Sequence, residues 1–201
     1  MTKLINGPLT ERTVHLCIDM QCLFSKDGPW PTPWMERVLP TVVRLVERFS
    51  ERTVFTRFIP PQHAEEMPGT WQRYYQHWRN ATRAHLDPAL IELMPPLAKF
   101  VPPAVVLDKP VYSAFAGRQL QLLLAERRAD ALVVTGSETD VCVLSTVLGA
   151  VDHGYRVILV KDGVCSSSDE GHDALLSLYH RRFSNQIEVA DCEEIISLWP
   201  G

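Results

Sequence analysis

Cys142 follows a predicted strand and a tight turn, a position at which a thiol can act as a nucleophile. The run 131–134 is apolar and β-branched and Gly136 follows it, a pattern typical of a buried strand that ends in a tight turn. Thr139 and Asp140 are suitable N-cap residues, so a helix is expected to begin there with Cys142 in its first turn. The partial positive charge and free N–H groups of a helix N-terminus favour a thiolate and can hold an oxyanion. A small buried cysteine that serves only packing is the alternative.

Two charged residues follow other predicted strands in the same way. Asp19 closes the apolar run that begins at Val14, and Lys109 follows the run 105–107. Ligands bind beyond the carboxyl ends of the strands in open α/β sheets, so Asp19, Lys109 and Cys142 are expected to meet in one cleft. A thiol, a carboxylate and an ammonium group together suit nucleophilic catalysis with a general base. Taken singly, Asp19 also fits a turn cap and Lys109 a solvated loop.

The elements that must position these residues alternate between strand and helix. The apolar runs predict strands at 14–19, 52–58, 105–107, 131–134, 156–160 and 186–190. Helical spacing predicts helices at 34–51, 86–97, 116–128, 139–153, 169–182 and 192–199, and Asp162-Gly163 predicts a turn. Parallel strands need right-handed crossovers, so helices cover both faces. We therefore predict an α/β fold, a three-layer α/β/α doubly wound sheet of six mainly parallel strands.

Length and composition limit the class of protein. The chain has 201 residues, 46% hydrophobic and 22% charged, as expected for a single domain over 1–201 with a loose N-terminal arm over 1–12. A net charge of −4 predicts no basic surface for nucleic acid, and no apolar run is long enough for a membrane span. The N-terminus lacks the hydrophobic region of a signal peptide, so we expect a cytoplasmic protein.

The spacing of cysteines and glycines excludes two further classes. The five cysteines include no C-x-x-C pair, so neither a disulfide framework nor a zinc site is expected. The chain contains neither G-x-G-x-x-G nor a P-loop, so a nucleotide-binding module is set aside.

Three blocks of sequence, taken together, are similar to one known family. They lie at residues 18–21, 109–115 and 136–143, and each coincides with the end of a predicted strand. On these blocks the chain, from about residue 13 to 190, resembles the isochorismatase-like cysteine hydrolases. This superfamily includes nicotinamidase and N-carbamoylsarcosine amidase.

The resemblance implies roles for individual residues. Asp19, Lys109 and Cys142 would form a catalytic triad, in which Asp19 takes the thiol proton and Lys109 stabilises the resulting charge. It also implies a cis peptide bond between Ser137 and Glu138, which turns the Glu138 N–H toward the oxyanion beside the N–H of Cys142. The implied activity is cleavage of a C–N bond in a small amide or ureide, through a thioester on Cys142 and without a metal.

Two alternatives to this activity stay open. Isochorismatase-type hydrolysis of a vinyl ether uses Asp19 as the acid and needs no thiol, although the retained Cys142 argues against it. A catalytically silent module for oligomerisation or binding is the other alternative, which the intact Asp19, Lys109 and Cys142 disfavour. Family members commonly form dimers or tetramers, so a homodimer or homotetramer is expected.

The chain departs from the nicotinamidases at their metal ligands. Those enzymes bind a metal through one Asp and two His that follow their second strand. Phe58, Pro60 and Tyr74 stand at these positions here, and none of the three is a usual metal ligand. We therefore expect no metal and no cofactor.

The substrate pocket is expected from the same resemblance and from the aromatic residues. Its members would be Gln21, Phe24, Arg57, Trp71 and Tyr112. Arg57 would pair with an anionic substrate, unless neighbouring carboxylates bind it instead. Aromatic residues at positions 71, 74, 75 and 78 have helical spacing, which indicates either a stripe in the core or the wall of a pocket.

Overall fold

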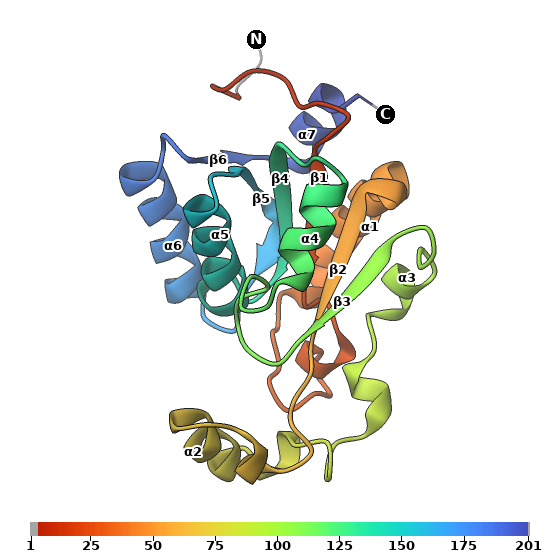
Figure 1. The fold of residues 1–201 in the computed structure, drawn as a ribbon, viewed down its shortest axis with the longest axis vertical. Helices are drawn as coiled ribbons and strands as arrows, with labels where there is room; N and C mark the ends of the chain where they lie inside the picture. Colours follow the sequence, from red (N-terminus) through yellow and green to blue (C-terminus); the bar gives the residue numbers. More distant parts are fainter. Residues whose placement is uncertain (1–3, 201) are drawn as a thin grey trace.

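The protein is built on one parallel sheet with helices on both faces (Figure 1). This computed structural model describes residues 4–200. The strands lie in the order β3-β2-β1-β4-β5-β6, and each neighbouring pair is parallel. They are β1 (Val14–Ile18), β2 (Thr53–Phe58), β3 (Val105–Lys109), β4 (Ala131–Ser137), β5 (Arg156–Cys165) and β6 (Ile187–Ala190). The α-helices are α1 (Met35–Phe49), α2 (Thr70–His77), α3 (Pro95–Ala98), α4 (Gln119–Glu126), α5 (Leu144–Asp152), α6 (Asp169–Arg182) and α7 (Cys192–Leu198). The predicted fold class is confirmed.

The central strands bury side chains on both faces of the sheet, as their continuous apolar runs predict. Leu132 and Val134 of β4 join a core cluster with residues of α4, α5 and α6. The alternate residue Val133 points the other way and joins a cluster with residues of α1 and α7. Successive side chains of a strand face opposite sides, so β4 contributes to both cores. No helix within residues 4–200 has the length and apolar character to cross a membrane.

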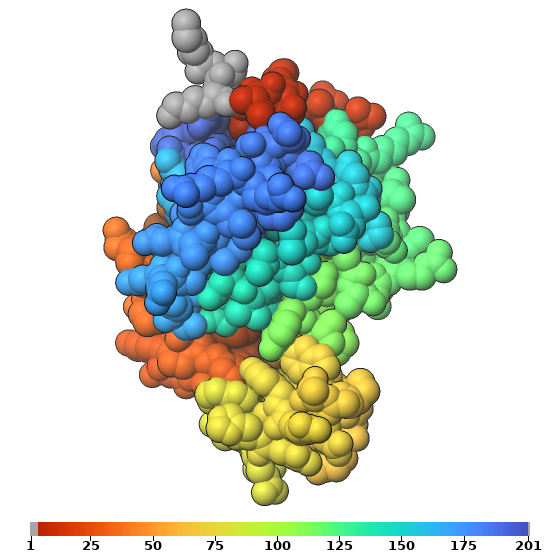
Figure 2. Space-filling model, turned by 90° about the vertical axis from the view of Figure 1, so that its left-hand side faces the viewer, coloured from red at the N-terminus to blue at the C-terminus, as the bar shows by residue number. Residues whose placement is uncertain are grey.

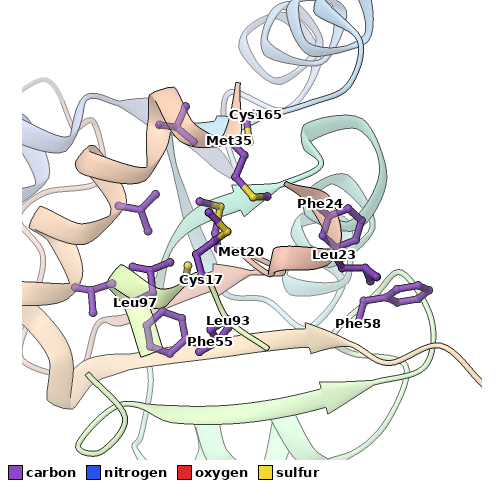
Figure 3. Packing of buried hydrophobic residues seen from close by; sticks show 14 of the residues in the cluster. Cys17, Met20, Leu23, Phe24, Met35, Phe55, Phe58, Leu93, Leu97 and Cys165 are labelled. Atoms are coloured by element: carbon purple, nitrogen blue, oxygen red, sulfur yellow. The ribbon is translucent and has the colours of Figure 1, made fainter. Parts of the chain in front are cut away.

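The segment between β2 and β3 carries α2 and projects from the rest of the molecule (Figure 2). A third apolar cluster lies at the base of this segment and contains Met20, Phe24, Phe58 and Met35 (Figure 3). Cys165 belongs to the same cluster, so this cysteine packs in the hydrophobic core. The cluster joins α1, the loop after β1 and the end of β2, so it supports the edge of the sheet from which Asp19 projects.

Several predicted boundaries are wrong, and each has a local cause. The predicted helix over 86–97 is a 3₁₀ turn, Pro88–Ile91, followed by the short α3, because Pro88, Pro95 and Pro96 lack the N–H groups that a continuous helix needs. The predicted turn at Asp162-Gly163 lies inside β5, which resumes its pairing with β4 at Val164 after an irregularity in register.

The N-terminal arm is packed against the domain where the structure describes it. Leu4 and Leu9 are buried, and Asn6 contacts the carboxylate of Glu188 through both its backbone N–H and its side-chain amide. The expectation of a loose arm is therefore wrong for residues 4–12, and residues 1–3 lie outside the described range.

His15 is a polar residue at the centre of the sheet. Its ring nitrogens contact the hydroxyls of Thr53 (3.1 Å) and Thr135 (2.8 Å), and its side chain is fully buried. Burial lowers the pKa of His15 to about 3, because a charged imidazole loses its hydration there.

We expect His15 to make the protein sensitive to acid. The unfolded chain takes up a proton near pH 6.5 and the folded chain only near pH 3, so stability falls as the pH drops between these values. Below pH 6 the loss attributable to His15 should approach about 1.4 kcal/mol per pH unit. Urea unfolding at pH 7, 6, 5 and 4 would measure it against His15→Gln, which has no group that titrates there. A stability difference between the two chains that does not change with pH would contradict this.

Gly136 allows β1 and β4 to approach closely at the end of the sheet that bears Asp19. It pairs with Ile18, its φ is +117°, and a Cβ at this position would lie 2.0 Å from the Ile18 carbonyl oxygen. We expect Gly136→Ala to lower the free energy of unfolding by at least about 3 kcal/mol, because strain and a backbone clash act together. Gly154→Ala is the matched control, since Gly154 has a φ of +79° with nothing within 4 Å of the added atom. Denaturant unfolding that gave equal losses for the two variants would refute the clash.

Candidate active site

Asp19 is held rigidly just beyond the end of β1. Its backbone N–H donates to the carbonyl of Thr56 (3.2 Å), and the hydroxyl of Thr56 donates to Oδ1 of Asp19 (2.6 Å). Its φ of +47° is rare for a residue with a side chain and is fixed by these contacts. The second carboxylate oxygen, Oδ2, lies 2.6 Å from Nζ of Lys109. Asp19 therefore presents a fully buried carboxylate in one fixed orientation.

Lys109 is the last residue of β3, and its side chain is 6% exposed. Nζ donates to the carbonyl of Val111 (3.1 Å) and lies 5.2 Å from the centre of the Phe58 ring. Burial lowers the pKa of Lys109, but the charges of Asp19 and Cys142 outweigh burial, so the net shift is upward. The group is thus a charged ammonium over the whole physiological range.

Cys142 lies against both charged groups. Its side chain is buried, and the thiol is near enough to the carboxylate of Asp19 and the ammonium of Lys109 for each to shift its pKa. Burial and the charge of Asp19 raise the pKa of Cys142 well above its usual value, while Lys109 opposes them. The helix terminus was expected to favour the thiolate, but burial and Asp19 together favour the thiol here. The residue is therefore a buried thiol beside a carboxylate.

The turn that carries Cys142 differs from the predicted helix start. Residues Thr139–Val143 form a π-helical turn that leads into α5, and Glu138 is the N-cap in an extended conformation. Thr139 and Asp140 have other partners, because Thr139 contacts Nδ1 of His172 (2.9 Å) and Asp140 accepts from Ser166. The peptide bond between Ser137 and Glu138 is cis.

An aromatic wall, defined here as Phe58, Trp71, Tyr74, Tyr75 and Tyr112, adjoins these groups. The rings of Trp71 and Tyr112 are 4.7 Å apart between centres, and Tyr112 follows Lys109 closely in the chain. The ring centre of Trp71 lies 5.4 Å from that of Tyr74 and 6.1 Å from that of Tyr75. The ring centre of Phe58 lies 6.5 Å from that of Tyr112 and 5.2 Å from Nζ of Lys109. The wall therefore adjoins the ion pair of Lys109 and Asp19.

The site does not fit a nicotinamidase-type metal. Phe58 and Pro60, at two of the three ligand positions, are buried, and Tyr74 stacks on Trp30 at the third. The ring centre of Trp30 also lies 5.9 Å from that of Phe58, so aromatic rings occupy this region. Within residues 4–200, no three His, Cys, Asp or Glu side chains are grouped so that they could bind a metal ion.

Two of the expected substrate-binding residues have structural roles instead. The amide of Gln21 is fully used, since its oxygen accepts from the N–H of Phe58 (2.7 Å) and its nitrogen donates to the carbonyls of Phe58 (3.1 Å) and Ile91 (2.6 Å). The guanidinium group of Arg57 binds Asp108 through two nitrogens (2.8 and 3.0 Å) and Glu92 through the third (2.7 Å). The amide of Gln21 therefore has no donor left for a substrate, which corrects that expectation. Arg57 uses three of its five N–H groups for Asp108 and Glu92, so its charge is already paired with carboxylates of the protein.

The other expected residues lie in or behind the wall. Trp71 and Tyr112 are half-buried members of it, whereas Phe24 is buried and stacks on Trp30 (6.1 Å). Thr56 was not anticipated from the sequence, although a buried carboxylate needs donors and the strand beside β1 is where one would be found.

Comparisons with known proteins agree with the fold. Residues 13–191 match the model of the Isochorismatase domain family. The chain is 38% identical over 86 residues to the "Uncharacterized isochorismatase family protein PncA" of Bacillus subtilis, a match over 43% of this chain and 47% of that protein. It is 30% identical over 120 residues to maleamate amidohydrolase of Pseudomonas putida, over 60% and 54% of the two chains. The matches thus span about half the length of these two relatives.

A solved structure is similar over nearly the whole chain. The crystal structure of nicotinamidase PncA from Bacillus subtilis superposes with a TM-score of 0.71 and 25% identity, over 90% of this chain and 99% of that one. Because the family match covers most of the sequence and the parallel sheet agrees with it, the chain belongs to the isochorismatase family of hydrolases.

Proposed function

We propose that the protein is a metal-independent cysteine amidohydrolase that cleaves a C–N bond in a small amide or ureide. The observation that carries this proposal is the buried ion pair of Asp19 and Lys109 beside the buried thiol of Cys142. The relatives named as amidohydrolase and nicotinamidase support amide bonds as the target. A homodimer or homotetramer is part of the proposal.

The first half of the reaction transfers the acyl group to sulfur. The Sγ–H bond of Cys142 breaks as its proton moves to Asp19, and Sγ forms a bond to the carbonyl carbon of the substrate. The carbonyl oxygen becomes an oxyanion, which the N–H groups of Glu138 and Cys142 stabilise. The C–N bond then breaks, and the amine leaves with the proton from Asp19.

The second half regenerates the enzyme. Asp19, again a carboxylate, removes a proton from water, and the oxygen of that water attacks the thioester carbon. The C–S bond breaks, the carboxylic acid leaves, and the proton returns from Asp19 to the sulfur of Cys142. Lys109 stays charged throughout and stabilises Asp19 as a carboxylate whenever the sulfur holds the proton.

The raised pKa of Cys142 fits this sequence of steps. A thiol that stays protonated at rest avoids oxidation and needs a base only when substrate is present, and the neighbouring Asp19 is the carboxylate that can act as this base. Small substrates are expected, because Asp19, Lys109 and Cys142 are all nearly closed to solvent.

The test is the release of ammonia or amine from a panel of small amides and ureides, including nicotinamide, maleamate and N-carbamoylsarcosine. We expect saturable turnover of at least one compound that prior dialysis against EDTA does not reduce. The absence of turnover for every amide and ureide, together with hydrolysis of a vinyl ether, would contradict the proposal.

A further inference from the structure

The turn that carries Cys142 is bound at its start by a segment that lies further along the chain. This segment, residues 166–172, comprises the loop after β5 and the first turn of α6, and we call it the clamp segment. Three consecutive residues, 138–140, each bind it through their side chains. These contacts join the Glu138 carboxylate to the N–H of Ser167 (3.3 Å), the Thr139 hydroxyl to Nδ1 of His172 (2.9 Å) and the Asp140 carboxylate to the hydroxyl of Ser166.

The carboxylate of Asp140 is held on two sides. One oxygen accepts from the hydroxyl of Ser166, a residue that is 4% exposed. The other, Oδ2, lies against Gly171 in the first turn of α6, where an added Cβ would be 2.3 Å from Oδ2 and 3.1 Å from Cγ. The N-terminus of a helix favours a negative charge. The start of α6 therefore attracts this carboxylate and, through Gly171, leaves room for it.

The turn of Cys142 lacks comparable support of its own. Its N-cap, Glu138, makes no capping hydrogen bond through its side chain within the described part of the chain. The carbonyl of Glu138 accepts from the N–H groups of Val141 (3.1 Å) and Val143 (3.0 Å), so residues 138–143 form one hydrogen-bonded unit. A displacement of residues 138–140 is therefore transmitted to Cys142.

The same unit carries the oxyanion hole of the proposed reaction, which consists of the N–H groups of Glu138 and Cys142. Donors of this kind are effective when they lie about 2.7–3.1 Å from the oxyanion. A misplacement of about 1 Å can lower the rate by about 100-fold. The rate of acyl transfer should therefore depend on how firmly the clamp segment holds the turn.

We propose that Ser166 and His172 are positioning residues for acyl transfer, which hold the turn so that the N–H groups of the oxyanion hole keep their direction. Ser166 acts through Asp140, and His172 acts through Thr139. The inference rests on the proposed function and deepens it, because it gives the loop after β5 and the start of α6 a part in the chemical step. Loss of either contact slows formation of the oxyanion and leaves the reactivity of the thiol itself unchanged.

The test compares two reactions of Cys142, of which only one forms an oxyanion. With p-nitrophenyl acetate, Sγ bonds to the carbonyl carbon, an oxyanion forms, and p-nitrophenolate leaves as the thioester is made. With iodoacetamide, Sγ displaces iodide from a saturated carbon, and no oxyanion forms. In both reactions the thiol proton passes to Asp19 and then to solvent, so the ratio of the two rate constants isolates the oxyanion hole.

The rate constants are measured by intact mass for the wild type, Ser166→Ala and His172→Ala, with Cys142→Ala as the blank for the other cysteines. We expect each alanine variant to lower the ratio of acetylation to alkylation by about 10- to 100-fold. The matched controls are Ser177→Ala and His180→Ala, which remove exposed side chains from the same helix. Both controls should keep the wild-type ratio.

Conservative variants separate positioning from a general loss of structure. Ser166→Thr keeps a hydroxyl for Asp140, and His172→Asn places an amide near the position of Nδ1. Both should restore most of the ratio that the alanine variants lose. They also keep the test decisive if Ser166→Ala does not fold, because His172 is only half-buried and its variants report on the same turn.

Three results would overturn the assignment. The first is a wild-type ratio in either alanine variant, which would remove that residue from the assignment. The second is an equal slowing of acetylation and alkylation, which would indicate general disruption, and the third is a failure of the conservative variants to restore the ratio. A wild type that neither p-nitrophenyl acetate nor any amide acylates, although iodoacetamide alkylates its Cys142, would instead refute the proposed function itself.

Discussion

Replacement of Cys142 by alanine should lower kcat for an accepted amide by about 10⁴-fold or more, because the proposed reaction has no route without the sulfur. The thiol lies beside the ion pair of Asp19 and Lys109, and alanine leaves both charged groups in place. Folding should survive, since the substitution removes one buried atom. Initial rates at saturating substrate would measure the effect.

Another buried free cysteine provides the control for this experiment. Cys192 is 1% exposed and lies in the cluster with α1 and α7, in a different core cluster from Cys142. Cys192→Ala should keep the wild-type kcat. Equal activity of Cys142→Ala and Cys192→Ala would mean that the chemistry does not use the thiol, as in hydrolysis of a vinyl ether with Asp19 as the acid.

Substitution of Asp19 by asparagine should damage both activity and stability. The amide cannot accept the thiol proton, so kcat should fall by about 10²- to 10⁴-fold. It also leaves the ammonium of Lys109 buried without its anion, which should lower the free energy of unfolding by roughly 3–5 kcal/mol. Urea unfolding and initial rates on the same preparation would measure the two effects.

The double variant separates the two roles of Asp19. Adding Lys109→Met to Asp19→Asn removes the unpaired charge, so stability should recover in part while activity stays lost. Recovery of activity together with stability would contradict the role of Asp19 as the base. It would show that Asp19 acts only by holding the fold together.

The sequence was sufficient to predict the architecture and the convergence of Asp19, Lys109 and Cys142. Apolar runs identify the strands that bear Asp19, Lys109 and Cys142, and parallel strands place their carboxyl ends at one edge of the sheet. The convergence depends only on which edge of the sheet each strand ends at, which an error of one or two residues does not change. Lys109, predicted to follow its strand, is its last residue.

The predictions that the structure did not support concern properties that depend on strand register and on packing. Arg57 and Asp108 are partners across the parallel pair β2–β3, so their side chains lie on the same face and bind each other. Strand pairing of this kind cannot be read from the sequence of either strand alone. The pKa of Cys142 depends in the same way on burial by distant segments, which outweighs the helix terminus that the local sequence suggested.

Direct detection of the acyl group on Cys142 tests the account most sharply. An accepted substrate would be mixed with the protein, quenched with acid within milliseconds and analysed by intact mass and peptide mapping. We predict an adduct with the mass of the substrate minus the departing ammonia or amine, located on Cys142, that disappears at the rate of turnover. Turnover that continues while no adduct forms on Cys142, with full activity retained by Cys142→Ala, would contradict it.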